Sequence, residues 1–257
     1  MANPVVQATG GFLQGTTNNN LTVTLPTTQA GDLAICFGAI RSGSATWTAP
    51  SAPWTQLFSQ GATSQNLSAW GIICTGSDTA PVLKCGTSGF IAGVITFRPP
   101  AGYQWLAVAS VLDDLTAYAT NSFNDVYFTT ADITPTNAAG SGNPFVIVRP
   151  MSRNTASAGN ATAVATSSGF TNTSADSNNN WLGVFQSQVF NVECRVDQNT
   201  GDQPGSTTLG ITWSGTPPAE SDLHDSVAFT LKTTPSSVPQ PIPFSRTQFF
   251  IADTIVM

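Results

Sequence analysis

The single histidine of this 257-residue chain, His224, is the first residue to consider for chemistry. Asp222 and Asp225 flank it, and a serine close in space would complete a Ser-His-Asp triad. General acid-base and nucleophilic catalysis need such a histidine, or paired carboxylates, beside an activated nucleophile. No Gly-x-Ser-x-Gly turn supplies one, and the segment after Thr216-Pro-Pro is typical of a solvated loop. We therefore predict a surface loop histidine and a protein that is not an enzyme.

Acidic residues are the second candidate, because paired carboxylates bind Ca²⁺ or act on glycosides. Asp113 and Asp114 are adjacent, so on a helix or strand they point in different directions and share a ligand poorly. The loop Asp197-Gln-Asn-Thr-Gly-Asp202 lacks the third-position Asp and the distal Glu of an EF-hand, which favours a plain Asx and glycine turn. The glycine clusters lack the lysine of a nucleotide site. We predict no metal and no cofactor.

The four cysteines, Cys36, Cys74, Cys85 and Cys194, are widely spaced and form no Cys-x-x-Cys pair. That spacing fits neither a zinc site nor a redox motif. We interpret them as buried, small apolar residues. A disulfide between Cys74 and Cys85 on neighbouring strands stays open as an alternative for an oxidising environment.

Six tryptophans could provide stacking surfaces for sugars. Trp70, Trp181 and Trp213 lie inside apolar stretches and are predicted to be core residues. Trp47 and Trp54 flank a proline-containing turn and are better candidates for exposure. If this chain binds glycans, we expect Trp47 and Trp54 to contact them.

Charge is scarce in this sequence. Only 9% of residues are Asp, Glu, Lys or Arg, against about a quarter in ordinary globular proteins. Eight basic and 14 acidic residues give a net charge of -6, which argues against binding to nucleic acid or to an anionic membrane surface. No apolar run reaches about 18 residues and the start lacks a basic and apolar leader, so we expect neither a membrane-spanning nor an exported chain. A 40% hydrophobic fraction still allows a sizeable core.

Short apolar runs rich in Val, Ile, Phe, Thr and Trp alternate with clusters of Gly, Ser, Asn and Pro, which is typical of strands and turns. A short helix is possible only at Val111 to Phe128, where Leu112, Leu115 and Tyr118 share a helical face. The predicted strands are Val5 to Thr9, Leu21 to Leu25, Leu33 to Ile40, Thr55 to Ser59, Leu67 to Cys74, Pro81 to Cys85, Ile91 to Phe97, Phe145 to Arg149, Trp181 to Val189, Thr207 to Trp213 and Ser226 to Leu231.

Two of these stretches predict contrasting positions in the fold. Leu33 to Ile40 is apolar at nearly every position, which suits a central strand covered on both faces. Leu21 to Leu25 alternates apolar and hydroxyl side chains, so one face should meet water. We predict an all-β protein, a two-sheet antiparallel β-sandwich with a jelly-roll-like arrangement.

The domain prediction is one sandwich over residues 1–232. Residues 31–98 and 144–232 correspond weakly in the order of their strands, which suggests an internal duplication. Two small barrels side by side are the alternative. We favour the single sandwich, because neither half has enough apolar positions for a core of its own.

Residues 233–257 differ from the rest. Pro235, Pro239, Pro241 and Pro243 should hold an extended spacer, and an apolar arm follows. An arm this apolar must pack somewhere, either on its own sandwich or, as we favour, on a neighbouring subunit or partner as an added strand. We expect that removal of residues 233–257 leaves a folded sandwich with weaker assembly. The predicted partner-binding residues are Phe244, Phe249, Phe250, Ile251, Ile255 and Val256.

The sequence resembles a family of bacteriophage virion proteins. The shared pattern is a short Thr-rich strand, a Gly-Asp-Leu apolar strand, a Pro-x-x-Trp-Thr segment, a Trp-containing strand and a Gly-Val-x-x-(Phe/Tyr)-Arg strand. The resemblance extends over roughly residues 5–232, with its sharpest motifs in the first hundred. The matching segments here are Leu21 to Leu25, Gly31 to Ile40, Pro50 to Gln56, Ala69 to Cys74 and Gly93 to Arg98.

This resemblance implies a structural component of the virion, assembled in the host bacterial cytoplasm, and it carries over no catalytic residues. We predict a homotrimeric decoration (cement) protein that bridges neighbouring subunits of the capsid. Its partners would be copies of itself and the major capsid protein or another virion protein. The alternative is a tail fibre or spike, or a lectin-like module that binds a receptor or glycan.

Overall fold

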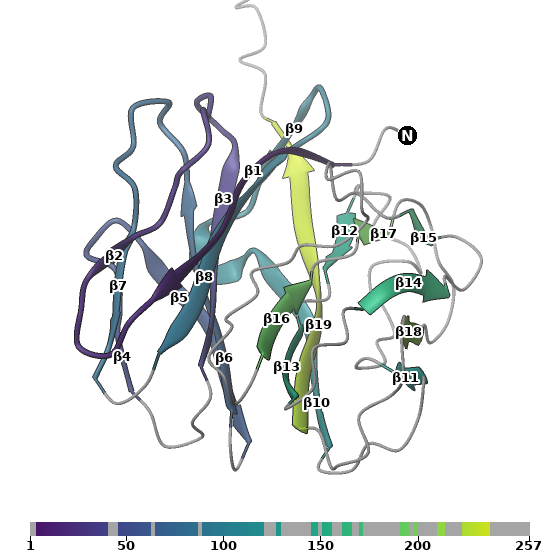
Figure 1. Ribbon diagram of the computed structural model, residues 1–257. Helices are drawn as coiled ribbons and strands as arrows, with labels where there is room; N and C mark the ends of the chain where they lie inside the picture. Colours follow the sequence, from purple (N-terminus) through teal and green to yellow (C-terminus); the bar gives the residue numbers. More distant parts are fainter. Residues whose placement is uncertain are drawn as a thin grey trace, which may run out of the picture.

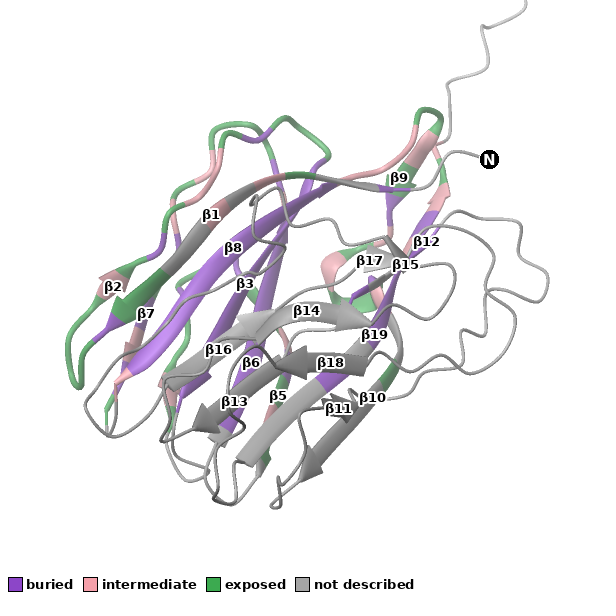
Figure 2. Ribbon diagram, turned by 45° about the vertical axis from the view of Figure 1, so that its right-hand side comes forward, coloured by how far each residue is buried: buried purple, intermediate pink, exposed green. Residues whose placement is uncertain are grey.

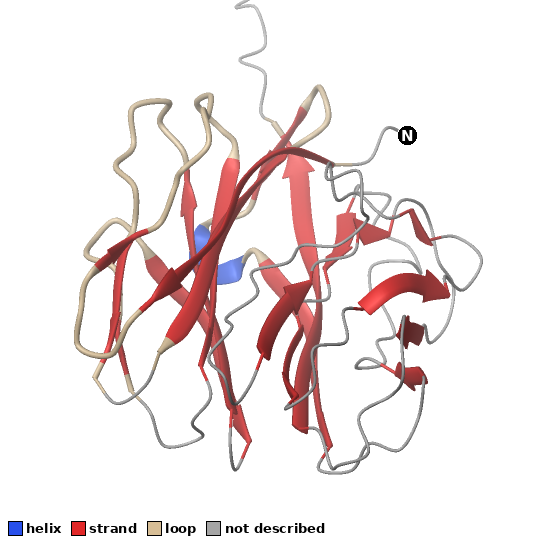
Figure 3. Cartoon of the chain, viewed as in Figure 1, coloured by secondary structure: helices blue, strands red, loops and turns tan. Residues whose placement is uncertain are grey.

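The computed structural model shows an all-β chain built from antiparallel sheets (Figure 1). The one helical element among the described residues is a 3-10 turn, η1, at Val108–Ser110 (Figure 3). The structure describes residues 4–40, 46–62, 65–86, 89–120, 127–129, 145–148, 151–155, 161–165, 170–171, 191–195, 198–199, 210–213 and 223–236.

A five-stranded sheet, called here the central sheet, is formed entirely by the first hundred residues. Each strand is antiparallel to its neighbours. In spatial order the strands are β1 (Val5–Gly15), β8 (Phe90–Arg98), β3 (Leu33–Ile40), β6 (Gln65–Ile73) and β5 (Thr55–Ala62).

The second sheet is assembled around β19 (Leu223–Pro235), the last described strand. Because β19 is 13 residues long, it pairs with several shorter strands along its two sides. The other strands of this sheet are β9 (Tyr103–Trp105), β10 (Leu112–Thr120), β12 (Phe145–Val148), β13 (Met151–Thr155), β15 (Phe170–Thr171), β16 (Asn191–Arg195) and β17 (Gln198–Asn199).

Two three-stranded sheets complete the described structure. The small sheet contains β2 (Leu21–Thr22), β7 (Val82–Cys85) and β4 (Trp47–Thr48). The other contains β11 (Tyr127–Thr129), β18 (Gly210–Trp213) and β14 (Ala161–Ala165).

Period-2 alternation on the central strands creates two separate cores, because successive side chains point to opposite faces of a sheet. Odd-numbered residues of β3, such as Leu33 and Phe37, join Phe229 and Leu231 of β19 in the inter-sheet core. The even-numbered Cys36 instead joins residues of the small sheet in the small-sheet core. Every residue of β3 is therefore buried. Figure 2 shows that β3, β8 and β6 are buried along most of their length.

The inter-sheet core shows how the fold matches the predicted sandwich. It contains Ile95 and Phe97 from the first half of the chain and Val146, Val148 and Phe229 from the second. Two antiparallel sheets thus bury a shared apolar layer, as in a β-sandwich. The all-β prediction is confirmed. The internal duplication stays a prediction, while β19 runs past the predicted boundary at residue 232 to Pro235.

Several sequence expectations can be checked strand by strand. The strand predicted at Leu33 to Ile40 has those bounds and is covered on both faces. In Leu21 to Leu25, Val23 is fully buried while Thr22 and Thr24 are exposed, as the alternation indicated, although only Leu21–Thr22 is paired as a strand. The predicted strand Trp181 to Val189 lies outside the described residues.

The expectation of a short helix at Val111 to Phe128 is wrong. Residues Leu112–Thr120 form β10 and pair antiparallel with β19. Leu115 is 48% exposed, so it does not share a buried face with Leu112. The helical periodicity was weak, and the long neighbouring strand β19 pairs with most residues of β10, which local helix propensity does not outweigh.

Candidate interaction surfaces

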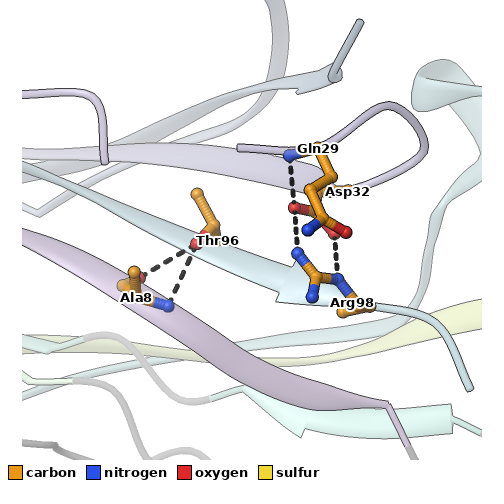
Figure 4. A network of polar contacts seen from close by, with 5 residues as sticks. All are labelled: Ala8, Gln29, Asp32, Thr96 and Arg98. Carbon is orange, nitrogen blue, oxygen red and sulfur yellow. Dashed lines mark hydrogen bonds and ion pairs between the residues drawn. The ribbon is translucent and has the colours of Figure 1, made fainter. Parts of the chain in front are cut away.

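An ion pair between the buried carboxylate of Asp32 and the partly exposed guanidinium of Arg98 joins the strands at one end of the central sheet (Figure 4). Asp32 precedes β3, and its side chain is 2% exposed. Arg98 ends β8 and donates from Nε to Oδ1 of Asp32 at 2.8 Å and from Nη2 to Oδ2 at 2.9 Å. This two-point geometry fixes both groups in one plane. The pair joins the Gly-Asp-Leu segment to the Gly-Val-x-x-Phe-Arg segment.

The turn before β3 explains why the sequence places Asp32 there. Gly31 adopts a φ of 88°, in the left-handed region that favours glycine. The Asp32 carboxylate also accepts a hydrogen bond from the backbone N–H of Gln29 at 2.8 Å. Its backbone carbonyl accepts from the N–H of Cys74 at 2.7 Å. Asp32 therefore ties together its own turn, β8 and the end of β6.

Electrostatics agree with this structural role. Burial alone would raise the pKa of Asp32, but hydrogen bonds from Arg98 and from the Gln29 amide outweigh that effect and lower it. The carboxylate is thus ionised at neutral pH and paired. A carboxylate held in this way stabilises the fold and offers no free base for catalysis.

Trp47 and Trp54 lie at the small sheet, where the sequence suggested exposed aromatic surfaces. The expectation that Trp54 is exposed is wrong: its side chain belongs to the small-sheet core and is 8% exposed. Trp47 is half-buried, and its ring makes edge contacts with Trp70 at 5.5 Å and Phe90 at 5.2 Å between ring centroids. Trp70 is buried as predicted. Glycan binding by Trp47 and Trp54 stays a prediction.

A polar network underlies Trp47. Its Nε1–H donates to Oδ1 of Asn66 at 2.8 Å, and the Ser68 hydroxyl donates to the same oxygen at 2.6 Å. Gly38 makes room for the ring, because a Cβ there would lie 2.9 Å from the Trp47 Cη2 atom. The tryptophan is locked in place by hydrogen bonding and by close packing. It is a structural residue whatever ligand its exposed part meets.

The described cysteines match the interpretation as buried apolar residues. Cys36, Cys74 and Cys85 are buried thiols, so the alternative of a Cys74–Cys85 disulfide is not what the structure contains. Burial, with the charge of Asp78 adding to it, raises the pKa of Cys74 to about 11. Its thiol is therefore protonated and weakly nucleophilic at neutral pH. Cys194 lies in β16.

His224 is placed differently from the sequence prediction. It lies within β19 and not in a loop, so that prediction is wrong. The backbone register sets it opposite Arg153 of β13 on one side and Thr120 of β10 on the other. Arg153 in turn lies opposite Glu193 of β16. This row of register partners was missed because the strands that carry it are distant in sequence.

The same register bears on the triad that His224 suggested. Asp225 follows His224 along β19, and consecutive strand residues lie on opposite faces of a sheet. Asp222 lies outside the described residues.

The acidic residues considered for metal binding are only partly described. Asp113 and Asp114 are adjacent in β10, at a shift in the register between β10 and β19. Asp197 and Asp202 lie outside the described residues. In the described part of the chain, no group of three or more His, Cys, Asp or Glu side chains is placed to hold a metal ion.

The two edges of the central sheet are candidate interaction surfaces that the sequence did not predict. The central sheet ends in β1 on one side and β5 on the other. Strand β5 contains no charged residue and no proline, the devices that usually protect an edge. Edges become recognisable only when the spatial order of strands is known.

Comparison with known protein families, curated proteins and solved structures finds no match to this chain. Among the residues that the structure describes, no helix is both long and apolar enough to cross a membrane. The predicted partner-binding residues, Phe244 to Val256, lie outside the described residues.

Proposed function

We propose that this chain is a non-enzymatic structural protein of a bacteriophage particle, a decoration protein that stabilises the capsid by bridging neighbouring subunits. In this proposal the protein is a homotrimer, its sandwich is jelly-roll-like, and its extended C-terminal arm reaches a partner. A protein that binds only the assembled shell stabilises that shell by mass action.

The observation that carries the proposal is that the segments that resemble phage virion proteins lie next to one another in a single sheet. Gly31 to Ile40, Ala69 to Cys74 and Gly93 to Arg98 supply the neighbouring strands β3, β6 and β8 of the central sheet. The Asp32–Arg98 ion pair joins two of them. Residues that look like scattered sequence matches thus make up one structural unit.

Low charge adds support, because hydroxyl and amide side chains are buried at an interface at less desolvation cost than ions. With 9% charged residues, this chain suits neutral packing against many copies of a shell protein. The paired state of Asp32 and the buried Cys74 agree with a scaffold, since neither offers a reactive group.

The test is to locate the protein on purified particles with gold-labelled antibody and to count copies by quantitative mass spectrometry. We expect labelling over the head at high copy number. Labelling at tail tips alone would overturn the decoration role in favour of a fibre or spike, and absence from particles would overturn the virion role. Light scattering on the purified protein should give three times the 26.7 kDa mass of one chain.

A further inference from the structure

We propose that the outer edge of β5 (Thr55–Ala62) accepts the apolar C-terminal arm of a second copy of this chain as an added strand. This inference rests on the proposed function, to which it adds the acceptor site. Strand addition of this kind draws affinity from main-chain hydrogen bonds and specificity from alternate side chains.

The acceptor edge is the outer side of β5, which is the last strand of the central sheet. Within the described part of the chain, β6 is the one strand that pairs with β5. Phe58 is 7% exposed, and its ring packs 5.6 Å from that of Phe229 across the inter-sheet core. By contrast, Thr55, Gln56 and Ser59 are exposed. Strand β5 is therefore anchored by Phe58 in the inter-sheet core, and its exposed side chains are polar but uncharged.

The opposite edge of the same sheet is better protected. Strand β1 carries two register shifts, between Val6 and Ala8 and between Thr9 and Phe12, and such irregularities disrupt an edge. The backbone after β2 also packs against it, since a Cβ at Gly10 would collide with the Thr24 carbonyl. Strand β5 has one shift, near its start, and its run from Phe58 to Ala62 pairs regularly. Of the two edges, β5 is the one suited to a further strand.

Apolar surface lies next to this edge. Leu57 of β5 and Leu112 of β10 are half-buried against the inter-sheet core. Strand β10 contacts β5. An arriving strand with alternate apolar residues would find hydrophobic contacts as well as hydrogen bonds.

The arm has the composition that this edge requires. Phe249 to Met257 reads Phe-Phe-Ile-Ala-Asp-Thr-Ile-Val-Met, rich in aromatic and β-branched residues and with a single charge. The chain leaves the sheet at Pro235, beyond which the Ser236 N–H donates to the Gly102 carbonyl at 2.8 Å. Residues 237–248 include three prolines and, if extended, would span roughly 35–40 Å. A spacer of that length is long enough to reach a second copy.

The experiment uses the full chain with the photo-crosslinking residue benzoylphenylalanine in place of Phe250. Equal amounts of ¹⁵N-labelled and unlabelled protein are mixed under dissociating conditions and reassembled, so that copies redistribute at random, and are then irradiated, digested and analysed by mass spectrometry. We expect cross-links between position 250 and the peptide containing residues 55–62, with half of them joining one labelled and one unlabelled copy. Cross-links confined to a single copy, cross-links to another strand, or no cross-links would each overturn the proposal.

A charged edge provides the second arm of the test. The double substitution Thr55→Lys and Gln56→Lys puts two positive charges at exposed positions of β5, and we expect the yield of cross-links between copies to fall about tenfold. The matched control, Thr22→Lys with Thr24→Lys, adds the same charge at exposed positions near the small sheet and should leave the yield unchanged. Equal loss in both variants would overturn the assignment to β5.

The outcome is separable from that of the proposed function. The cross-link map is measured on purified protein, whereas the virion role is tested on particles. Labelling on the capsid with cross-links elsewhere would leave the function and remove the β5 assignment. Cross-links at β5 with no protein on particles would keep the β5 assignment and overturn the proposed virion function.

Discussion

The two faces of the central sheet belong to the same strands but are covered by different elements and carry side chains of different size. Toward the second sheet, β3 presents the large side chains of Leu33, Ile35 and Phe37, which meet equally large residues of β19. Toward the small sheet, it presents the small residues Ala34, Cys36 and Gly38, with the larger Ile40 at its end. Small residues on that face leave space for tryptophans from the covering loops and strands. The difference shows that alternation along one strand encodes the kind of cover as well as burial.

The largest effect should come from the inter-sheet face. Phe37 is fully buried, and its ring stacks 6.5 Å from that of Phe229. We expect Phe37→Ala to lower the free energy of unfolding by about 3–5 kcal/mol, because it leaves a cavity between two sheets that cannot close together. Chemical denaturation measures it. A loss below that of Phe37→Leu would contradict the contrast between the faces.

The second-largest effect is expected at Asp32, at the start of β3. We expect Asp32→Asn to lower the free energy of unfolding by about 1.5–3 kcal/mol, since it weakens hydrogen bonds between charged groups. The pKa of Asp32 is lowered in the fold, so its stabilisation is complete above the ordinary value of 3.8 and is lost as pH falls through the folded value. Melting curves should therefore show an acid-dependent loss in the wild type that Asp32→Asn lacks. Parallel acid profiles would refute this account of the pair.

The small-sheet face is tested one residue along from Phe37. Gly38→Ala places a Cβ 2.9 Å from the Trp47 ring, and we expect this overpacking to cost about 1–3 kcal/mol. The control is Gly86→Ala, where a Cβ would meet only the Asn18 Oδ1 atom, at 3.8 Å, and stability should be unchanged. Tryptophan fluorescence should change with Gly38→Ala alone. Equal stability of the two variants would remove the packing argument.

The smallest effect concerns pH on that same face. The pKa of Cys74 is raised by burial from 9.0 to about 11, so the folded state keeps the proton that the unfolded chain releases. Stability is complete below pH 9 and is lost as pH rises toward 11, by about 1 kcal/mol at pH 10. The difference in melting temperature between wild type and Cys74→Ala should be constant below pH 9 and should change only as pH rises toward 11. An alkaline loss of the same size in Cys74→Ala would assign it to other groups.

Burial on both faces made β3 predictable from sequence, because a short continuous apolar run between turn residues is typical of a strand that is covered on both sides. Strand β10 was not predictable, since Asp113, Asp114 and a nearby register shift hide its alternation and its stability comes from β19. The Asp32–Arg98 pair was missed for a related reason. The two residues are 66 positions apart, and only the β3–β8 pairing brings them together. Long-range pairing is the part of the fold that local pattern does not contain.

The prediction that Trp54 is exposed was wrong for another reason. A proline-containing turn predicts surface location of the backbone, but the turn at Ala52-Pro53 directs the following side chain into the small-sheet core. Large aromatic residues beside a turn often cover the end of a core, because little else there is large enough. The edge position of β5 was likewise not predictable, because it depends on the spatial order of the strands.

The position of β19 has a consequence for how the protein is made. All members of the small-sheet core, from Val23 to Val94, leave the ribosome early, so that core can close while the rest of the chain is still being synthesised. The inter-sheet face cannot close in the same way, because Val227, Phe229 and Leu231 are translated last among its residues. More than a hundred residues are synthesised between the end of β8 and Val227, and until then the Leu, Ile and Phe side chains on the inter-sheet face lack their partners on β19. That interval is when aggregation or chaperone binding matters most for this protein.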